Sequence, residues 1–204
     1  MVEAARPPQS LGNVPAQTLD KRIDSLKPFV DCINDNCELG LIQACDAAGF
    51  NSMSGAAKMV VGNPDNAHYL IFTRGMLELV DQFHRQGDKI SLICDDDEET
   101  AEICYLHYKA VRRVYHKART KIISLTFAND RYFPALQAAD MISFLSRLQA
   151  KWEFYREEYD LRKLFEYLIE DRGAKHATWL KQFADKATTN RLSLALEAVK
   201  RERH

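Results

Sequence analysis

Short apolar runs alternate with longer amphipathic segments along this chain, and this alternation limits the fold more than any other feature. Three runs have the length and composition of strands: residues 38–45 (ELGLIQAC), 89–95 (KISLICD) and 121–127 (KIISLTF). Apolar residues at helical spacing predict helices over about 18–34, 65–86, 98–117 and 133–152. Strands that alternate with helices indicate an α/β core in which helices flank a sheet. The nearly continuous apolar run at 90–94 predicts an internal strand that is buried on both faces.

The chain has 204 residues, enough for one domain or for one domain with an appendage. Residues 1–17 carry Pro, Gln, Ser and Gly without an apolar run, which predicts a flexible tail. The α/β core is expected over residues 18–151. Residues 152–204 are expected to form a helical C-terminal extension, in which Trp179, Leu180 and Phe183 share one helical face and residues 192–199 form a further helix.

Composition, charge and motifs exclude several classes of protein. The formal net charge is −1, so any contact with nucleic acid needs a local basic patch. No apolar run approaches the roughly 18–20 residues of a membrane span, so no membrane partner is expected. The five cysteines include no C-x-x-C pair, and their odd number predicts a reducing, cytoplasmic setting. The motifs of serine hydrolases, P-loop proteins and dinucleotide-binding enzymes do not occur in the sequence.

Asp140 interrupts an almost wholly apolar or small stretch, FANDRYFPALQAADMISFLSR. Its neighbours one turn away are Leu136 and Phe144, so the spacing predicts that Asp140 lies on the buried side of its helix. A buried carboxylate is costly unless it is paired, hydrogen-bonded or bound to a metal. Two interpretations stay open: a metal ligand that Gln137 supports, or an aspartate hydrogen-bonded to the backbone or to Arg147.

A second acidic feature ends the strand at 89–95. Asp95 begins the run Asp-Asp-Asp-Glu-Glu, and ligands of open α/β sheets bind just beyond the carboxyl ends of strands. The alternative is that the run only caps the next helix and complements its dipole. Asp130, in the following strand-to-helix connection, is a third candidate ligand or else an ordinary turn residue.

Carboxylate oxygens are the ligands that hard cations such as Mg²⁺ or Mn²⁺ prefer. A pair of such ions can activate water and stabilise the leaving oxygen in phosphodiester hydrolysis. The sequence therefore predicts a divalent-metal site in which Asp95 and Asp140 bind the metal, while Asp130 orients water or a second ion.

Basic residues gather on the helix predicted over 98–117. Lys109, Arg112, Arg113 and His116 fall at i, i+3, i+4 and i+7, opposite the apolar stripe, and Lys117 follows them. Such a face can hold phosphates, and the tyrosines between these residues can stack bases. The alternative is an ordinary solvated face that balances the acidic turn.

The order of these features resembles a family called domain of unknown function 3800, which is similar to ribonuclease H in fold. The family's strand end, turn and helix motif are matched by Asp95, Asp130, Leu136, Gln137, Ala139, Asp140, Met141, Ile142 and Arg147. The match covers about residues 65–150. The resemblance implies a ribonuclease H-like mixed sheet flanked by helices and a metal-dependent nuclease activity.

The chain departs from the family at one feature. Members usually begin with a strand that ends in Asp-Glu-Ser-Gly, whose aspartate would be the first metal ligand, and Asp46 is the only substitute in this sequence. The leading hypothesis is a metal-dependent nuclease. The alternatives are a degenerate, non-catalytic module that binds nucleic acid or protein, and a small-nucleotide phosphohydrolase. A sheet without its first strand exposes an edge, which predicts pairing with a partner chain or homo-oligomer formation.

Overall fold

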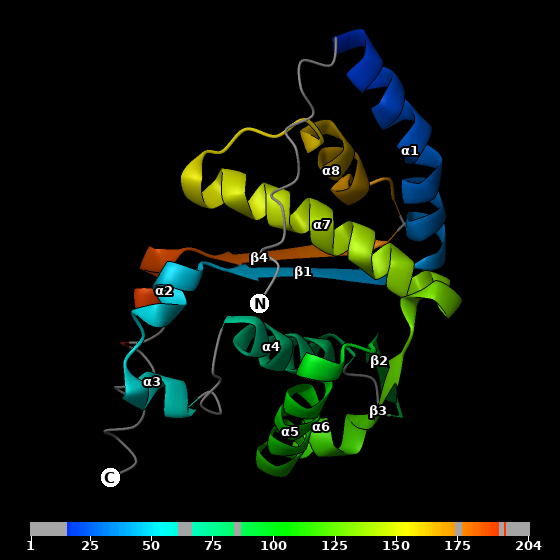
Figure 1. Ribbon diagram of the computed structural model, residues 1–204. Helices are drawn as coiled ribbons and strands as arrows, with labels where there is room; N and C mark the ends of the chain where they lie inside the picture. The colour runs from blue at the N-terminus through cyan, green and yellow to red at the C-terminus, as the bar shows by residue number, and fades with distance from the viewer. Residues whose placement is uncertain (1–15, 61–66, 84–86, 174–176, 192–193, 195–204) are drawn as a thin grey trace, which may run out of the picture.

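The structure is a computed structural model that describes residues 16–60, 67–83, 87–173, 177–191 and 194 (Figure 1). The helices are α1 (Ala16–Asn36), α2 (Ala47–Asn51), α3 (Gly55–Val60), α4 (Ala67–Gln82), α5 (Glu98–Val114), α6 (His116–Lys121), the 3-10 helix η1 (Asp130–Tyr132), α7 (Pro134–Tyr155) and α8 (Arg162–Ile169). The strands are β1 (Leu39–Cys45), β2 (Ile90–Asp95), β3 (Ile122–Ala128) and β4 (Thr178–Ala184). The protein is therefore mixed α/β, with helices predominating.

Most of the predicted elements are confirmed. The three predicted strands are β1, β2 and β3, and the predicted helices at 18–34 and 133–152 are α1 and α7. Pro134 stands in the first turn of α7, where its missing N–H costs nothing, whereas α1 continues through Pro28 instead of starting after it. The helix predicted over 98–117 is interrupted at Tyr115, whose extended backbone separates α5 from α6.

The segment around Trp179 is a strand, so the helix predicted there is wrong. β4 runs parallel to β1, with Leu39 opposite Thr178 and Cys45 opposite Ala184. The apolar residues of this segment do have helical spacing, but the backbone ladder that β1 offers outweighs such a weak local preference. The extension after residue 152 therefore contributes α8 and a strand, while residues 192–199 lie outside the described residues apart from Leu194.

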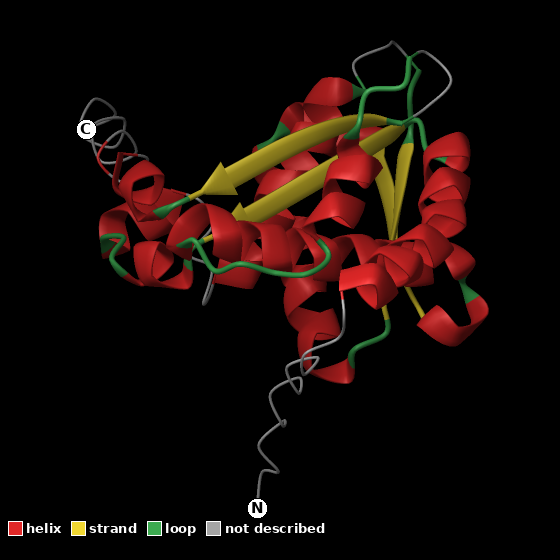
Figure 2. Ribbon diagram, turned by 90° about the horizontal axis from the view of Figure 1, so that it is seen from above, coloured by secondary structure: helices red, strands yellow, loops and turns green. Residues whose placement is uncertain are grey.

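The described strands form two separate sheets, which corrects the expectation of a single one. β1 pairs only with β4 and β2 only with β3, both in parallel, and Figure 2 shows the two pairs running in different directions. β2 is also not buried on both faces, because its residues alternate between half-buried and exposed. Leu92 packs with Leu125 under the helices, while Ile93 points away from them and is 49% exposed.

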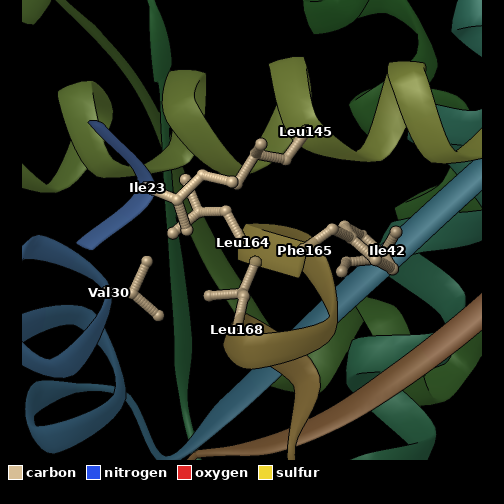
Figure 3. Packing of buried hydrophobic residues seen from close by; sticks show 7 residues of the cluster. All are labelled: Ile23, Val30, Ile42, Leu145, Leu164, Phe165 and Leu168. Atoms are coloured by element: carbon tan, nitrogen blue, oxygen red, sulfur yellow. The ribbon is translucent and has the colours of Figure 1, made fainter. Parts of the chain in front are cut away.

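The larger core lies around the β1–β4 pair. Figure 1 shows α7 and α8 on one side of this pair and α4 on the other, and α1 packs against α8. Its buried members come from α1, β1, α7 and α8: Ile23, Val30, Ile42, Leu145, Leu164, Phe165 and Leu168 (Figure 3). Full burial of an aliphatic or phenyl side chain stabilises a fold by about 1.5–3 kcal/mol, so this cluster holds α7 on β1.

A second core lies between the β2–β3 pair and the helices that cover it, and is built from α4, α5, α6 and β3. Its buried members are Met76, Val80, Tyr108, Val111, Ala118 and Ile122. α4 contacts both β1 and α5, so it joins the two halves of the molecule.

Asn34, Gly40 and Trp179 place β4 beside β1. The Trp179 indole N–H donates to the Asn34 side-chain oxygen at 2.8 Å, and the Asn34 amide donates to the Leu168 carbonyl at 3.2 Å. The Asn34 backbone carbonyl also accepts from Ala177 N–H at 3.1 Å. Gly40 lies directly opposite Trp179, and a Cβ atom at position 40 would overlap the indole ring. The parallel pair therefore requires both the buried asparagine and the glycine.

We expect Gly40→Ala to lower the free energy of unfolding by about 1–3 kcal/mol, because the added methyl group overfills the space that the Trp179 ring occupies. Urea denaturation followed by tryptophan fluorescence measures the change. Gly55→Ala is the matched control, since no atom lies within 4 Å of a Cβ at that position. Equal stability of the two variants would contradict this packing.

Asn34→Ala is expected to destabilise the protein by about 1–3 kcal/mol, because it leaves the partly buried Trp179 indole N–H and the buried Leu168 carbonyl without these partners. Asn34 is 1% exposed. The control is Asn36→Ala on the same helix. Its exposed amide bonds the carbonyl and the sulfur of Cys32, and the substitution should cost less than about 0.5 kcal/mol. Calorimetric unfolding of both variants distinguishes the two effects.

Candidate functional site

The carboxyl ends of β2 and β3 meet at one edge of their sheet. Asp95 lies opposite Ala128 in the parallel register, and the Asp96 N–H donates to the Ala128 carbonyl at 3.0 Å. The turn that follows β3 leads into η1 and then into α7, so Asp130 and the start of α7 lie at this same edge. We call the three candidate ligands Asp95, Asp130 and Asp140 the acidic edge.

Asp130 is a turn residue, as the alternative interpretation predicted. The cap of η1 is Asn129, whose side-chain oxygen accepts from Arg131 N–H at 3.0 Å. The Asp130 backbone carbonyl accepts from the Gln137 amide at 3.0 Å. Gln137 therefore ties α7 to this turn, and the Asp130 side chain is only partly exposed.

Asp140 is exposed, so the prediction that it lies on the buried side of α7 is wrong. The buried residues of α7 come later, at Leu145, Ser146, Gln149 and Ala150, where the helix crosses β1. The neighbouring Phe144 is itself 42% exposed, because these turns of α7 lie before the part that packs in the core. An exposed carboxylate needs no partner to offset burial, and Asp140 is available to a ligand in solvent.

The acidic run after Asp95 has two parts. Asp97 starts α5, because its carbonyl accepts from Ala101 N–H at 2.9 Å and its carboxylate accepts from the Thr100 hydroxyl at 3.0 Å. This agrees with the interpretation of the run as a helix cap. Asp95 and Asp96 are exposed and precede the helix, so they remain accessible at the acidic edge.

The acidic edge has the donor chemistry of a hard-cation site but is not a complete one. Within the described parts of the chain, no three His, Cys, Asp or Glu side chains lie close enough together to hold one ion. Mg²⁺ is usually bound by one or two protein carboxylates and completes its shell with water and substrate phosphates. The carboxylates therefore fit such an ion only together with ligands from a substrate or another chain.

The basic residues do not form one continuous face. The helix breaks at Tyr115, so Lys117 belongs to α6, and it lies 3.9 Å from the Asp81 carboxylate. On α5, Arg113 is exposed, and the Lys109 ammonium lies 5.4 Å from the centre of the exposed Tyr105 ring. Lys109 and Arg113 are thus the members of this set that are free to meet a phosphate backbone.

Arg112 has a structural position. Its guanidinium donates to the Tyr108 hydroxyl at 2.9 Å and to the Arg119 carbonyl at 3.5 Å, and it lies 5.2 Å from the centre of the Tyr108 ring. Its Nε atom is buried and has no hydrogen-bond partner in the described part of the chain. Arg112 therefore joins α5 to the end of α6, which removes it from the predicted phosphate-binding set.

A cleft of about 700 Å³ lies between β1, α4 and α7, and sequence reasoning did not find it. Residues 41–45 of β1 and the following Asp46 line it, together with one face of each helix and Leu92 of β2. Arg147 and Lys151 bring positive charge to an otherwise mainly apolar lining. The size lies in the range of natural ligand sites, but no local signal marks the cleft, because its walls come from distant parts of the chain.

Asp46, which the family resemblance suggested as a substitute for a first metal ligand, lines this cleft. Its carboxylate accepts from Ala48 N–H at 3.1 Å, which caps α2, and from the Tyr155 hydroxyl. The bond to Asp46 raises the pKa of Tyr155 because it favours the protonated phenol. Asp46 is buried, with 6% of its surface exposed, and its carboxylate already accepts hydrogen bonds from two donors.

The nearby cysteines are poor nucleophiles. Burial raises the pKa of the Cys94 thiol, next to Asp95, to about 11. Burial also raises the pKa of Cys45 in the cleft. Since the thiolate is the reactive form, burial disfavours the reactive form of both groups.

Comparisons of the chain with protein-family models, with curated proteins and with solved structures found no match. The resemblance to the domain of unknown function 3800 family therefore stays a hypothesis that depends on the motif at 127–147. None of the helices in the described ranges combines the length and the apolar character that a membrane crossing requires.

Proposed function

We propose that the chain is a ribonuclease H-like, divalent-metal-dependent nuclease subunit that hydrolyses phosphodiester bonds at the acidic edge. The observation that supports this best is the origin of its three carboxylates. They come from the end of β2, the turn after β3 and the second turn of α7, and these elements pack together at the strand ends, where ligands of α/β sheets bind.

The chemistry of the edge suits this reaction. Asp95 and Asp140 are exposed, so each carboxylate is accessible to an ion that also contacts a substrate phosphate. The bond between the Asp130 backbone carbonyl and Gln137 holds the turn that carries the Asp130 carboxylate, which we propose orients a water molecule. A bound Mg²⁺ or Mn²⁺ supplies water activation and stabilises the leaving oxygen.

Cleavage of end-labelled RNA and DNA in the presence of Mn²⁺ tests the nuclease proposal. We expect Asp140→Asn and Asp95→Asn to reduce the rate at least as much as the loss of an outer-shell partner of a metal, about 10–100-fold. Asp160→Asn, which changes an exposed aspartate between α7 and α8, is the control and should keep the rate. A chelator should stop the reaction in every variant.

Two results would refute the nuclease proposal. One is the lack of metal-dependent cleavage of either nucleic acid by the intact chain. The other is cleavage that Asp140→Asn leaves unchanged. Cleavage of free nucleotides alone would instead favour the small-nucleotide phosphohydrolase.

A second candidate is a non-catalytic module that binds nucleic acid through α5. The exposed Lys109 and Arg113 favour it, and so does the incomplete set of metal ligands at the acidic edge. In this case binding should be electrostatic, insensitive to sequence and independent of the divalent ion.

The salt dependence of binding measures this second function. For a protein that contacts duplex DNA phosphates, the observed affinity falls with salt at a slope of about −0.9 for each phosphate contact. Arg113→Gln should reduce the slope by about one contact, while Arg22→Gln on the exposed face of α1 should leave it unchanged. Fluorescence anisotropy across a salt series gives both slopes, and a flat dependence would exclude phosphate contacts.

A further inference from the structure

β1 has one unpaired edge. The Glu38 carbonyl and the Asp46 N–H both bond to the β4 segment, at 3.1 and 3.0 Å, so even-numbered residues direct their backbone groups at β4. Successive residues of a strand direct these groups to opposite edges, so Leu41, Gln43 and Cys45 direct theirs away from β4. No described strand pairs with that second edge.

The cleft follows this unpaired edge. Residues 41–46 line it without a gap, whereas one face of a strand would contribute only every second residue. α7 lies above β1 and α4 below it (Figure 1), and both helices line the cleft together with Leu92 of β2. The space therefore has the form of a slot beside β1. A strand in this slot would have a helix on each face, as an internal strand of an α/β sheet has.

The charge of the slot indicates what it accepts. Arg147 and Lys151 line it from α7. The Arg147 guanidinium lies 5.7 Å from the centre of the Phe144 ring, and the Lys151 ammonium lies 3.6 Å from an exposed Glu157 carboxylate. Asp46, at the end of the slot, is already engaged by Tyr155. The slot is thus complementary to an apolar ligand that carries negative charge.

An extended peptide fits these features better than a small molecule does. An apolar small molecule would leave the outward N–H and C=O groups of β1 without partners, whereas a strand satisfies them. The chain's own terminal segments are poorly suited: residues 1–15 contain Pro7, Pro8 and Pro15, and residues 195–204 carry Lys200, Arg201 and Arg203. The prolines lack the backbone N–H groups that a strand donates, and the basic residues would be repelled by Arg147 and Lys151.

We propose that the slot receives an extended, acidic segment of a partner polypeptide, which adds to β1 as a third strand and directs a carboxylate at Arg147. Backbone bonds to Leu41, Gln43 and Cys45 would provide the affinity, and the apolar walls with Arg147 the selectivity. This inference does not depend on nuclease activity.

The probe is a set of fluorescein-labelled heptapeptides of alternating valine and threonine, in which a single aspartate occupies each position in turn. We expect at least one to bind the full chain and its lysine counterpart to bind at least about tenfold more weakly, because only the aspartate pairs with Arg147. Arg147→Glu should reverse the preference, whereas Arg22→Glu, outside the slot, should not.

Hydrogen exchange on the bound chain tests the strand geometry. The amides of Leu41, Gln43 and Cys45 should gain protection on binding, while those of Gly40, Ile42 and Ala44 should not change, since they already face β4. Three results would overturn the proposal: no peptide binds, Arg147→Glu leaves the order of affinities unchanged, or the odd-numbered amides gain no protection. A dimer in sedimentation that protects these amides without peptide would assign the slot to a second copy instead.

Discussion

The buried side chain of Asn34 is the contact on which the rest of this fold depends. It accepts a bond from the Trp179 indole and donates one to the Leu168 carbonyl, so it joins α1, α8 and β4 at one point. These partners lie far apart in the sequence, and a buried amide with both groups satisfied is stable only in this arrangement. β4 is the one described strand that pairs with β1, so Asn34 helps to fix the strand pair beside which the cleft lies.

The packing of α7 separates two sites along one helix. Its later turns, around Leu145, lie on β1 and form a wall of the cleft, whereas its early turns lie beside η1 at the acidic edge. Arg147 and Asp140 are two turns apart on the same side of the helix. A rigid helix therefore connects the proposed catalytic edge to the proposed strand-binding slot, so a partner in the slot would lie two helical turns from Asp140.

The sequence predicted part of the candidate site for sound physical reasons. Asp95 ends an apolar strand, so its place at the strand end followed from the pattern, and the capping role of Asp97 followed from its position before a helix. The burial of Asp140 was predicted wrongly, because apolar neighbours indicate a buried face only where another element covers them. Arg112 had the spacing of a phosphate-binding residue, but its contacts with Tyr108 and Arg119 exist only once α6 folds against α5.

Local patterns in the sequence determined where most of the helices and the first three strands lie, because periodicity, capping residues and prolines act over a few neighbouring residues. Tertiary structure alone decided that residues 178–184 form a strand, that the strands divide into two pairs, and that a cleft opens beside β1. These features come from contacts between segments that are distant in the sequence, such as Gly40 with Trp179. The free energy of such contacts depends on how whole elements pack, which the spacing of residues within one segment does not encode.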